Sequence, residues 1–211
     1  MALHVLRCAA YSALGAARRR PGASPFTDAI TPIYVPLRAL DAFGHVNNTR
    51  YLEFFEFARW ERGVRHGMLG HMLKNKCIEV VGTSHVQYMK EMKAWRFVNV
   101  RSEYIGVSGR AVVLQQTLEG QQPHQRTGRP TVYAVGIFKM TFLQQGKPLE
   151  FRDVCHAFGC PAEYERIVAA SKGADGAPLP HLRDMHASDD AWRAALRPPK
   201  GPKPPKPPKA A

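Results

Sequence analysis

The chain has 211 residues, of which 45% are hydrophobic and 22% are charged. This composition supplies enough apolar surface for a packed core and excludes a wholly disordered chain. No apolar run reaches the roughly 18–20 residues that a membrane-spanning helix needs, so the sequence predicts no transmembrane segment. Four cysteines in a chain of this length do not make a disulfide framework.

The formal net charge is +13, from 30 basic and 17 acidic residues. Residues 31–160 alone carry 17 basic and 10 acidic side chains, so the middle of the chain is basic in its own right. Such a balance suits a partner that carries phosphates, which could be RNA, an anionic membrane surface or a phosphorylated small molecule. A generally basic surface without such a partner is an equal alternative, because net charge alone does not select one.

The N-terminal segment, residues 1–26, contains Arg7 and Arg18–Arg20 and no acidic residue, and it is otherwise rich in Ala, Leu and Ser. This composition is typical of a mitochondrial transit peptide. It predicts a protein of the mitochondrial matrix. The alternative is an unstructured basic N-terminus.

The next elements are a short strand at Ile33–Leu37 and a long helix from Asn48 to about Gly67. Apolar side chains cover most of the circumference of the first helical turns, and they are Tyr51, Leu52, Phe54, Phe55, Phe57 and Ala58. A helix that is apolar nearly all round is buried, so this helix is predicted to be central. Gly67 and Gly70 are expected to end it.

Four β-rich runs follow the helix, at residues 78–89, 95–107, 111–119 and 131–143. Ser108-Gly109 predicts a tight hairpin between the second and third runs. The polar stretch at residues 120–130 is longer than a tight hairpin needs and predicts a protruding loop. The expected fold class is α+β, with one antiparallel sheet wrapped around the central helix over residues 31–151.

The C-terminal part divides into two segments. Residues 152–196 predict a helical appendage, in which one helix opens at Pro161 and a second starts at Ser188. Residues 197–211 alternate Pro and Lys and predict an extended, polyproline-like arm. As a free tail this arm would be disordered, or it would lie along an acidic or phosphate-bearing surface of a large assembly.

The most informative stretch is residues 40–59, LDAFGHVNNTRYLEFFEFAR. It resembles the hotdog-fold acyl-CoA thioesterases, and more narrowly the 4-hydroxybenzoyl-CoA thioesterase group. The matching positions are Asp41, Gly44, His45, Val46, Asn47, Asn48, Tyr51, Leu52, Phe55, Glu56, Ala58 and Arg59. The resemblance implies a hotdog fold and an acyl-CoA substrate, with no cofactor beyond the coenzyme A of the substrate. It also implies pairing with a second copy, with active sites at the subunit boundary.

The resemblance assigns the catalytic carboxylate to Asp41, which would attack the thioester carbonyl or activate a water. Helix N-termini present unpaired N–H groups that can polarise a carbonyl, so the backbone at His45–Asn48 and the Asn48 side chain are the expected partners. The remaining expected binding residues near this loop are Gly44, Val46, Asn47 and Tyr51. Glycine at position 44 would let the backbone approach a bound group closely.

A purely structural interpretation of the same residues stays open. Asp41 can be a turn residue before a helix, and His45, Asn47 and Asn48 can be capping and loop partners. Glu56 is a second possible catalytic carboxylate on the central helix. Its spacing of three from Arg59 favours a local ion pair instead.

Basic and aromatic residues alternate over residues 88–97, YMKEMKAWRF. We expect Tyr88 and Phe97 in the strand core and Lys90, Lys93 and Arg96 at the rim of a phosphate-binding mouth. The alternative is stacking of the aromatic rings on RNA bases.

No metal site is expected from the His and Cys spacing. Cys155, His156 and Cys160 lack a fourth ligand at zinc spacing. His66 and His71 do not share one helix face.

Two functions therefore follow from the sequence. The first is a mitochondrial acyl-CoA thioester hydrolase in which Asp41 and the helix N-terminus act on the thioester, in a homo-oligomer. The second is a non-catalytic hotdog subunit of a large mitochondrial assembly such as the mitochondrial ribosome, which contacts RNA or protein through its basic surface and tail.

Overall fold

The central helix, α2, spans Asn48–Arg65 in the computed structural model, which describes residues 2–125, 127–172, 177, 179–180, 182–184, 187–188 and 191. Its buried apolar residues are Tyr51, Phe54, Phe55, Phe57 and Ala58. The helix starts where the Asn47 side chain accepts a hydrogen bond from the Thr49 N–H, and it ends before Gly67, whose φ of 77° is left-handed. A short helix, α3 (Met68–Lys74), follows and includes Gly70, which therefore does not end a helix as expected.

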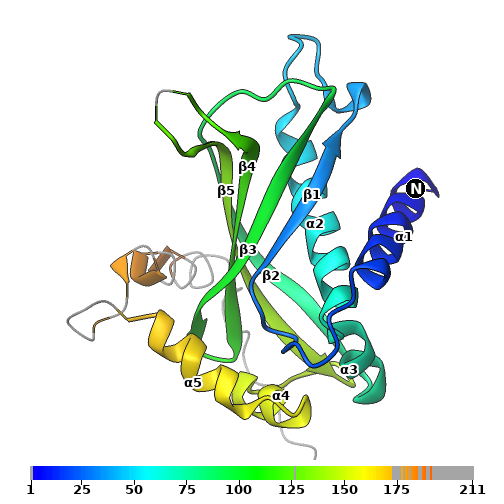
Figure 1. Ribbon diagram of the computed structural model, residues 1–211. Helices are drawn as coiled ribbons and strands as arrows, with labels where there is room; N and C mark the ends of the chain where they lie inside the picture. The colour runs from blue at the N-terminus through cyan, green and yellow to red at the C-terminus, as the bar shows by residue number, and fades with distance from the viewer. Residues whose placement is uncertain are drawn as a thin grey trace, which may run out of the picture.

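One antiparallel sheet curls around α2 (Figure 1). Its strands are β1 (Ala29–Val35), β2 (Cys77–Tyr88), β3 (Arg96–Ser108), β4 (Ala111–Pro123), β5 (Pro130–Gln144) and β6 (Lys147–Pro148). The strand order is β1-β3-β4-β5-β2, and β6 pairs with β5. This arrangement confirms the expected α+β hotdog fold. Since α2 connects β1 to β2, the helix crosses from one edge of the sheet to the other.

Several element boundaries differ from the sequence prediction, and the first strand already starts at Ala29 instead of Ile33. The first strand ends at Val35, because Pro36 precedes a single 3-10 turn at Leu37–Ala39. The expected loop at residues 120–130 is mostly a continuation of the hairpin, in which Pro123 pairs with Pro130. Residues 121–123 are exposed, so this end of the hairpin lacks the alternation of apolar and polar residues by which a strand is recognised in a sequence.

A buried polar link joins α2 to the sheet. Gln116 on β4 is fully buried and donates to the Phe55 carbonyl at 3.1 Å, while its Oε1 accepts from Arg59 at 2.8 Å. The Arg59 guanidinium lies 4.7 Å above the centre of the Phe138 ring. These contacts help to fix the rotation of α2, because the Gln116 amide and the Arg59 guanidinium find partners only in this orientation.

The N-terminal segment contains a helix, α1 (Ala2–Ala17), that packs beside α2 (Figure 1). The Tyr11 and Phe57 rings stack 5.0 Å apart, and Arg18 reaches the fully buried Glu61 carboxylate at 2.9 Å. Gly15 allows the close approach, since any Cβ there would meet the Glu61 carbonyl. The segment predicted to be transit-like, residues 1–26, thus includes a packed helix. The last residue of that segment, Phe26, is fully buried in the core.

The polar groups at the outer edge of β1 have partners on α1 and in the turn after it. The Tyr34 N–H donates to the Tyr11 hydroxyl at 3.3 Å, and Arg18 donates to the Ile30 carbonyl at 3.3 Å. An unpaired sheet edge invites association with another strand. These contacts cover that edge.

The C-terminal appendage begins with α4 (Phe151–Ala157) and α5 (Pro161–Ala170), which close the end of the sheet opposite the 37–47 loop (Figure 1). The helix expected to open at Pro161 is confirmed, whereas α4 was not expected. Of the second predicted appendage helix only residues 188 and 191 are described, and the Pro/Lys arm at 197–211 lies outside the described residues. No described helix combines the length and hydropathy required to cross a bilayer.

Candidate functional site

The loop before α2 is a turn organised by Asp41. Its Oδ1 accepts a hydrogen bond from the Phe43 N–H at 2.9 Å and lies 3.4 Å from the backbone nitrogen of His45. The backbone closes the turn, since the Asp41 N–H donates to the His45 carbonyl at 2.9 Å. Gly44 lies at φ 76°, which an L side chain rarely adopts. Asp41 therefore is a turn residue, as one of the two interpretations of the sequence has it. Its carboxylate is partly exposed and belongs to the loop that leads into the helix.

The start of α2 is held from both sides. The Val46 N–H donates to the Met92 carbonyl and the Asn47 N–H to the Ala39 carbonyl, each at 2.9 Å. The Tyr88 hydroxyl donates to the Asn48 carbonyl at 3.1 Å. The residues that the structure brings together around this helix N-terminus are Asp41, Gly44, His45, Val46, Asn47, Asn48 and Tyr51. Asn47, not Asn48, is the capping residue.

The segment after β2 contributes the expected basic residues. His45 Nε2 lies 3.0 Å from the exposed Glu91 carboxylate, so residues 89–95 lie beside the Asp41 loop. Lys90, Lys93 and Arg96 are all exposed there, and Arg96 donates to the Tyr133 hydroxyl at 3.2 Å. These three cations are thus exposed on the segment beside the Asp41 loop, and their contact with phosphates stays a prediction.

The expectation that Tyr88 and Phe97 are core residues is wrong. They are 43% and 57% exposed. Phe97 points outward from the β1–β3 pair, where its ring lies 5.1 Å from that of Tyr34. Trp95, which precedes it, is 69% exposed. The alternation of side chains along a strand separates the two faces of the sheet, but it does not show which face the helix covers, so both aromatic residues were placed on the wrong face.

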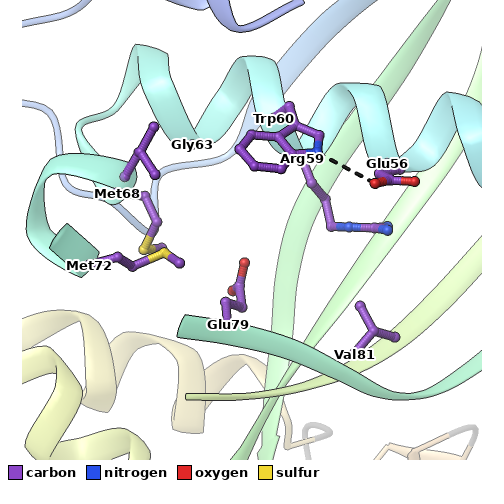
Figure 2. A pocket seen from close by; sticks show the side chains of 9 residues that line it. Glu56, Arg59, Trp60, Gly63, Met68, Met72, Glu79 and Val81 are labelled. Carbon is purple, nitrogen blue, oxygen red and sulfur yellow. Dashed lines mark hydrogen bonds between the residues drawn. The ribbon is translucent and has the colours of Figure 1, made fainter. Parts of the chain in front are cut away.

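A cavity of about 230 Å³ lies between the second half of α2, α3 and β2 (Figure 2). Most of its lining is apolar: Trp60, Gly63, Met68, Leu69, Met72 and Val81. Three charged side chains complete it: Glu56, Arg59 and Glu79. Asp41 is not part of this lining. The cavity therefore lies beside the second half of α2, whereas the Asp41 loop lies before the first residue of that helix.

Glu79 is a functional candidate that the sequence analysis missed. Its Oε1 is shielded from solvent and has no hydrogen-bond partner among the described residues. Burial raises the pKa of the Glu79 carboxyl, while the charges of Arg62 and Arg59 act in the opposite direction. The sequence held one indication of a buried charge here. In the segment CIEVV, strand alternation places Glu79 on the same face as Val81.

The expected local pair of Glu56 and Arg59 is replaced by other contacts. Arg59 turns under the helix to Gln116, and burial lowers the pKa of its guanidinium. Glu56 Oε1 lies 3.5 Å from the Trp60 indole nitrogen (Figure 2). Its Oε2 lies 3.3 Å from His4 Nε2 on α1.

Comparisons with known proteins agree with this architecture. Residues 35–159 match a family profile described as the thioesterase-like superfamily. Over 86 residues the chain is 30% identical to the long-chain acyl-CoA thioesterase FadM of Escherichia coli (strain K12), a match that covers 39% of this chain and 65% of that protein. The chain thus spans just under two thirds of the length of this relative.

Two solved structures show the same fold. The probable thioesterase YbaW from Escherichia coli has a TM-score of 0.51 and 25% identity, over 61% of this chain and 97% of the other. The protein SAV2348 from Staphylococcus aureus, solved in complex with CoA, has a TM-score of 0.53 and 15% identity, over 67% of this chain and 86% of the other. The second likeness concerns the fold alone.

Proposed function

The chain belongs to the thioesterase-like superfamily, and on that premise we propose that it hydrolyses the thioester bond of an acyl-CoA. The observation that carries the proposal is the place of Asp41: a partly exposed carboxylate in the turn directly before the N-terminus of the central helix. The relative FadM, named as a long-chain acyl-CoA thioesterase, supports the substrate class.

The proposed chemistry uses the carboxylate and the helix together. Asp41 activates a water, or attacks directly, at the thioester carbonyl carbon. The first N–H groups of α2, with the Asn48 side chain and the His45 backbone, stabilise the oxyanion that forms. When water attacks, the carbon–sulfur bond breaks, the coenzyme A thiolate takes up the proton that Asp41 accepted from the water, and the acyl group leaves as a carboxylic acid. When Asp41 attacks, the same bond breaks to leave an acyl–Asp41 anhydride, and its hydrolysis by water releases the carboxylic acid and supplies the proton of the thiol. No cofactor takes part beyond the coenzyme A of the substrate.

The cavity is the proposed site of the acyl chain. It begins at Glu56, eight residues along α2 from Asn48, which corresponds to about 12 Å of helix. Its apolar lining suits the acyl chain, while the basic residues Lys90, Lys93 and Arg96 suit the phosphates of coenzyme A at the other end. SAV2348, which has the same fold, was solved in complex with CoA, and this supports coenzyme A as part of the ligand proposed here.

We also propose a second copy as partner and the mitochondrial matrix as location. The uncovered β2 edge, where Ile78 and Val80 are 58% and 37% exposed, supports pairing through this strand. The basic, acid-free composition of residues 1–26 supports mitochondrial import, through a signal that stays in the mature protein because α1 and Phe26 pack in its fold.

Thiol release from a panel of acyl-CoAs tests the activity. We expect turnover by the native chain and a loss of at least about 100-fold in kcat for Asp41→Asn. Asparagine keeps the Oδ1 acceptor of the turn, so the loop stays formed while the charge is removed. Asp153→Asn, the same change at an exposed position on α4, is the matched control. Absence of turnover at every chain length, or full activity of Asp41→Asn, contradicts the proposal.

A second candidate function is a non-catalytic subunit of a large mitochondrial assembly such as the ribosome. The observation that favours it is the exposed aromatic side chains of Trp95 and Phe97, which alternate with the exposed cations Lys93 and Arg96 along the chain. Exposed rings flanked by cations suit stacking on single-stranded RNA. Salt-dependent quenching of Trp95 fluorescence by single-stranded RNA, combined with no acyl-CoA turnover, would favour this function over the first.

A further inference from the structure

Two neighbouring helices bring a histidine, a cysteine and a glutamate together away from the Asp41 loop, and the glutamate, Glu56, also belongs to the lining of the cavity. His4 and Cys8 lie four residues apart on one face of α1, and Glu56 approaches them from α2. Their ligating atoms all lie within 4.8 Å of one another. Imidazole nitrogen, thiolate sulfur and carboxylate oxygen are the three donor types that zinc takes in proteins.

Two of the three distances between these atoms match those around one tetrahedral ion, and the third, from Cys8 Sγ to the Glu56 carboxylate, lies within 4.8 Å. Zinc binds nitrogen and oxygen at about 2.0–2.1 Å and sulfur at about 2.3 Å, so in a tetrahedron nitrogen and oxygen lie about 3.3 Å apart and nitrogen and sulfur about 3.6 Å apart. His4 Nε2 lies 3.3 Å from Glu56 Oε2 and 3.6 Å from Cys8 Sγ. The ligands therefore need little movement to share an ion.

The surroundings orient the histidine for this role. The Nδ1 side of its ring faces the Glu53 carboxylate at 3.9 Å, and Glu53 is held in turn by Arg7 at 3.1 Å. A carboxylate on the far nitrogen is the usual way in which proteins fix a metal-binding histidine. The ring also lies 5.5 Å from Phe57, which limits its rotation.

We propose that His4, Cys8 and Glu56 bind a zinc ion, with water in the fourth position. The His4 and Glu56 side chains are 37% and 39% exposed, so the fourth position opens to solvent. The ion joins the N-terminal helix to the central helix, because two ligands come from α1 and the third from α2. Its function is to hold α1 in its docked position.

Proton release follows from the chemistry of the thiol. A cysteine thiol has to lose its proton to become a zinc ligand. Zinc binds the thiolate and displaces that proton. Affinity therefore rises with pH.

Cobalt(II) is the probe that tests the site, since a cobalt–thiolate bond produces a charge-transfer absorption band. We expect the full-length chain to bind one equivalent with this band, and excess zinc to bleach it. Cys8→Ser removes the band, and Glu56→Gln and His4→Ala weaken binding. Cys160→Ser, a change at another partly buried free thiol, leaves the band intact.

The effect on the fold is measured separately from the ligand set. Zinc should raise the melting temperature of the native chain and protect α1 from proteolysis, and Cys8→Ser should abolish both effects. If the folded native chain produces no thiolate band with cobalt, or if the band survives Cys8→Ser but not Cys160→Ser, the proposal is wrong. Since Glu56 also lines the cavity, the zinc proposal is decided by Cys8→Ser and His4→Ala, which lie outside that lining, and its failure leaves the role of Asp41 in acyl-CoA hydrolysis untouched.

Discussion

His66 is a buried histidine whose charge the fold opposes. It is 3% exposed, and burial together with the charges of Arg62, Arg65 and Arg20 lowers its pKa from 6.5 to about 4. The unfolded chain therefore binds a proton between pH 6.5 and 4 that the native state does not bind. Because the unfolded state holds more protons there, stability falls as the pH falls through this window.

We expect this histidine to cost about 2–3 kcal/mol of stability between pH 7 and pH 4. Urea unfolding across this range measures the effect, with His66→Gln as the variant that removes it. The His66→Gln profile should be flatter by that amount. A His66 resonance that titrates near its ordinary pKa would contradict the prediction.

Glu79 makes the opposite contribution. Because burial raises its pKa in the folded state, the stability that it contributes is present at low pH and is lost as the pH rises above the unfolded pKa. Glu79→Gln should therefore stabilise the protein by about 1 kcal/mol at neutral pH and leave it unchanged near pH 4. Thermal melts at the two pH values measure this. Glu165→Gln, at an exposed position on α5, should change neither melt.

At the scale of the element, α1 depends on a glycine that local propensity disfavours. Alanine at a helix interior is more favourable than glycine by about 1 kcal/mol, so an isolated helix would gain from Gly15→Ala. In the folded protein the new Cβ meets the Glu61 carbonyl, which is backbone and cannot turn aside. We expect Gly15→Ala to destabilise the protein by about 1–3 kcal/mol.

The sign of the change distinguishes packing from propensity. Thermal melts and proteolysis within α1 measure it, and Ala16→Gly at a neighbouring exposed position is the control, with only the propensity cost. A higher melting temperature for Gly15→Ala would mean that α1 is not docked on α2.

The elements differ in how far the sequence could predict them. The four long strands and the central helix were placed within a few residues, because period-two alternation and the start at Asn47–Asn48 are local signals. The docking of α1 was not predictable, since Gly15 has meaning only beside Glu61. The seven-residue helix α4 is too short to establish a helical period.

The same division holds for the candidate site. The Asp41 turn could be recognised from residues 41–48 because its contacts lie within the loop. The cavity could not, since Glu79 meets α2 only after β2 has returned along the helix. The His4, Cys8 and Glu56 cluster likewise needs two segments that are about fifty residues apart.

At the scale of the whole molecule, β2 is the open edge of the sheet among the described strands. Its exposed apolar residues Ile78 and Val80 predict that two copies pair there. The double variant Ile78→Lys and Val80→Lys should therefore be monomeric while the native chain is a dimer. Light scattering after size-exclusion chromatography measures this at micromolar concentration. A monomeric native chain would contradict the prediction.

The contacts that cover β1 also set a limit on growth. A sheet with two free margins can recruit a neighbour on each side and extend without end, as fibres do. Here Tyr11 and Arg18 occupy the polar groups of one margin, so recruitment is restricted to the other. Two copies that meet there related by a twofold axis leave no further margin to offer. We therefore predict that α1 limits polymerisation of the proposed dimer, so that a chain lacking this helix would aggregate more readily.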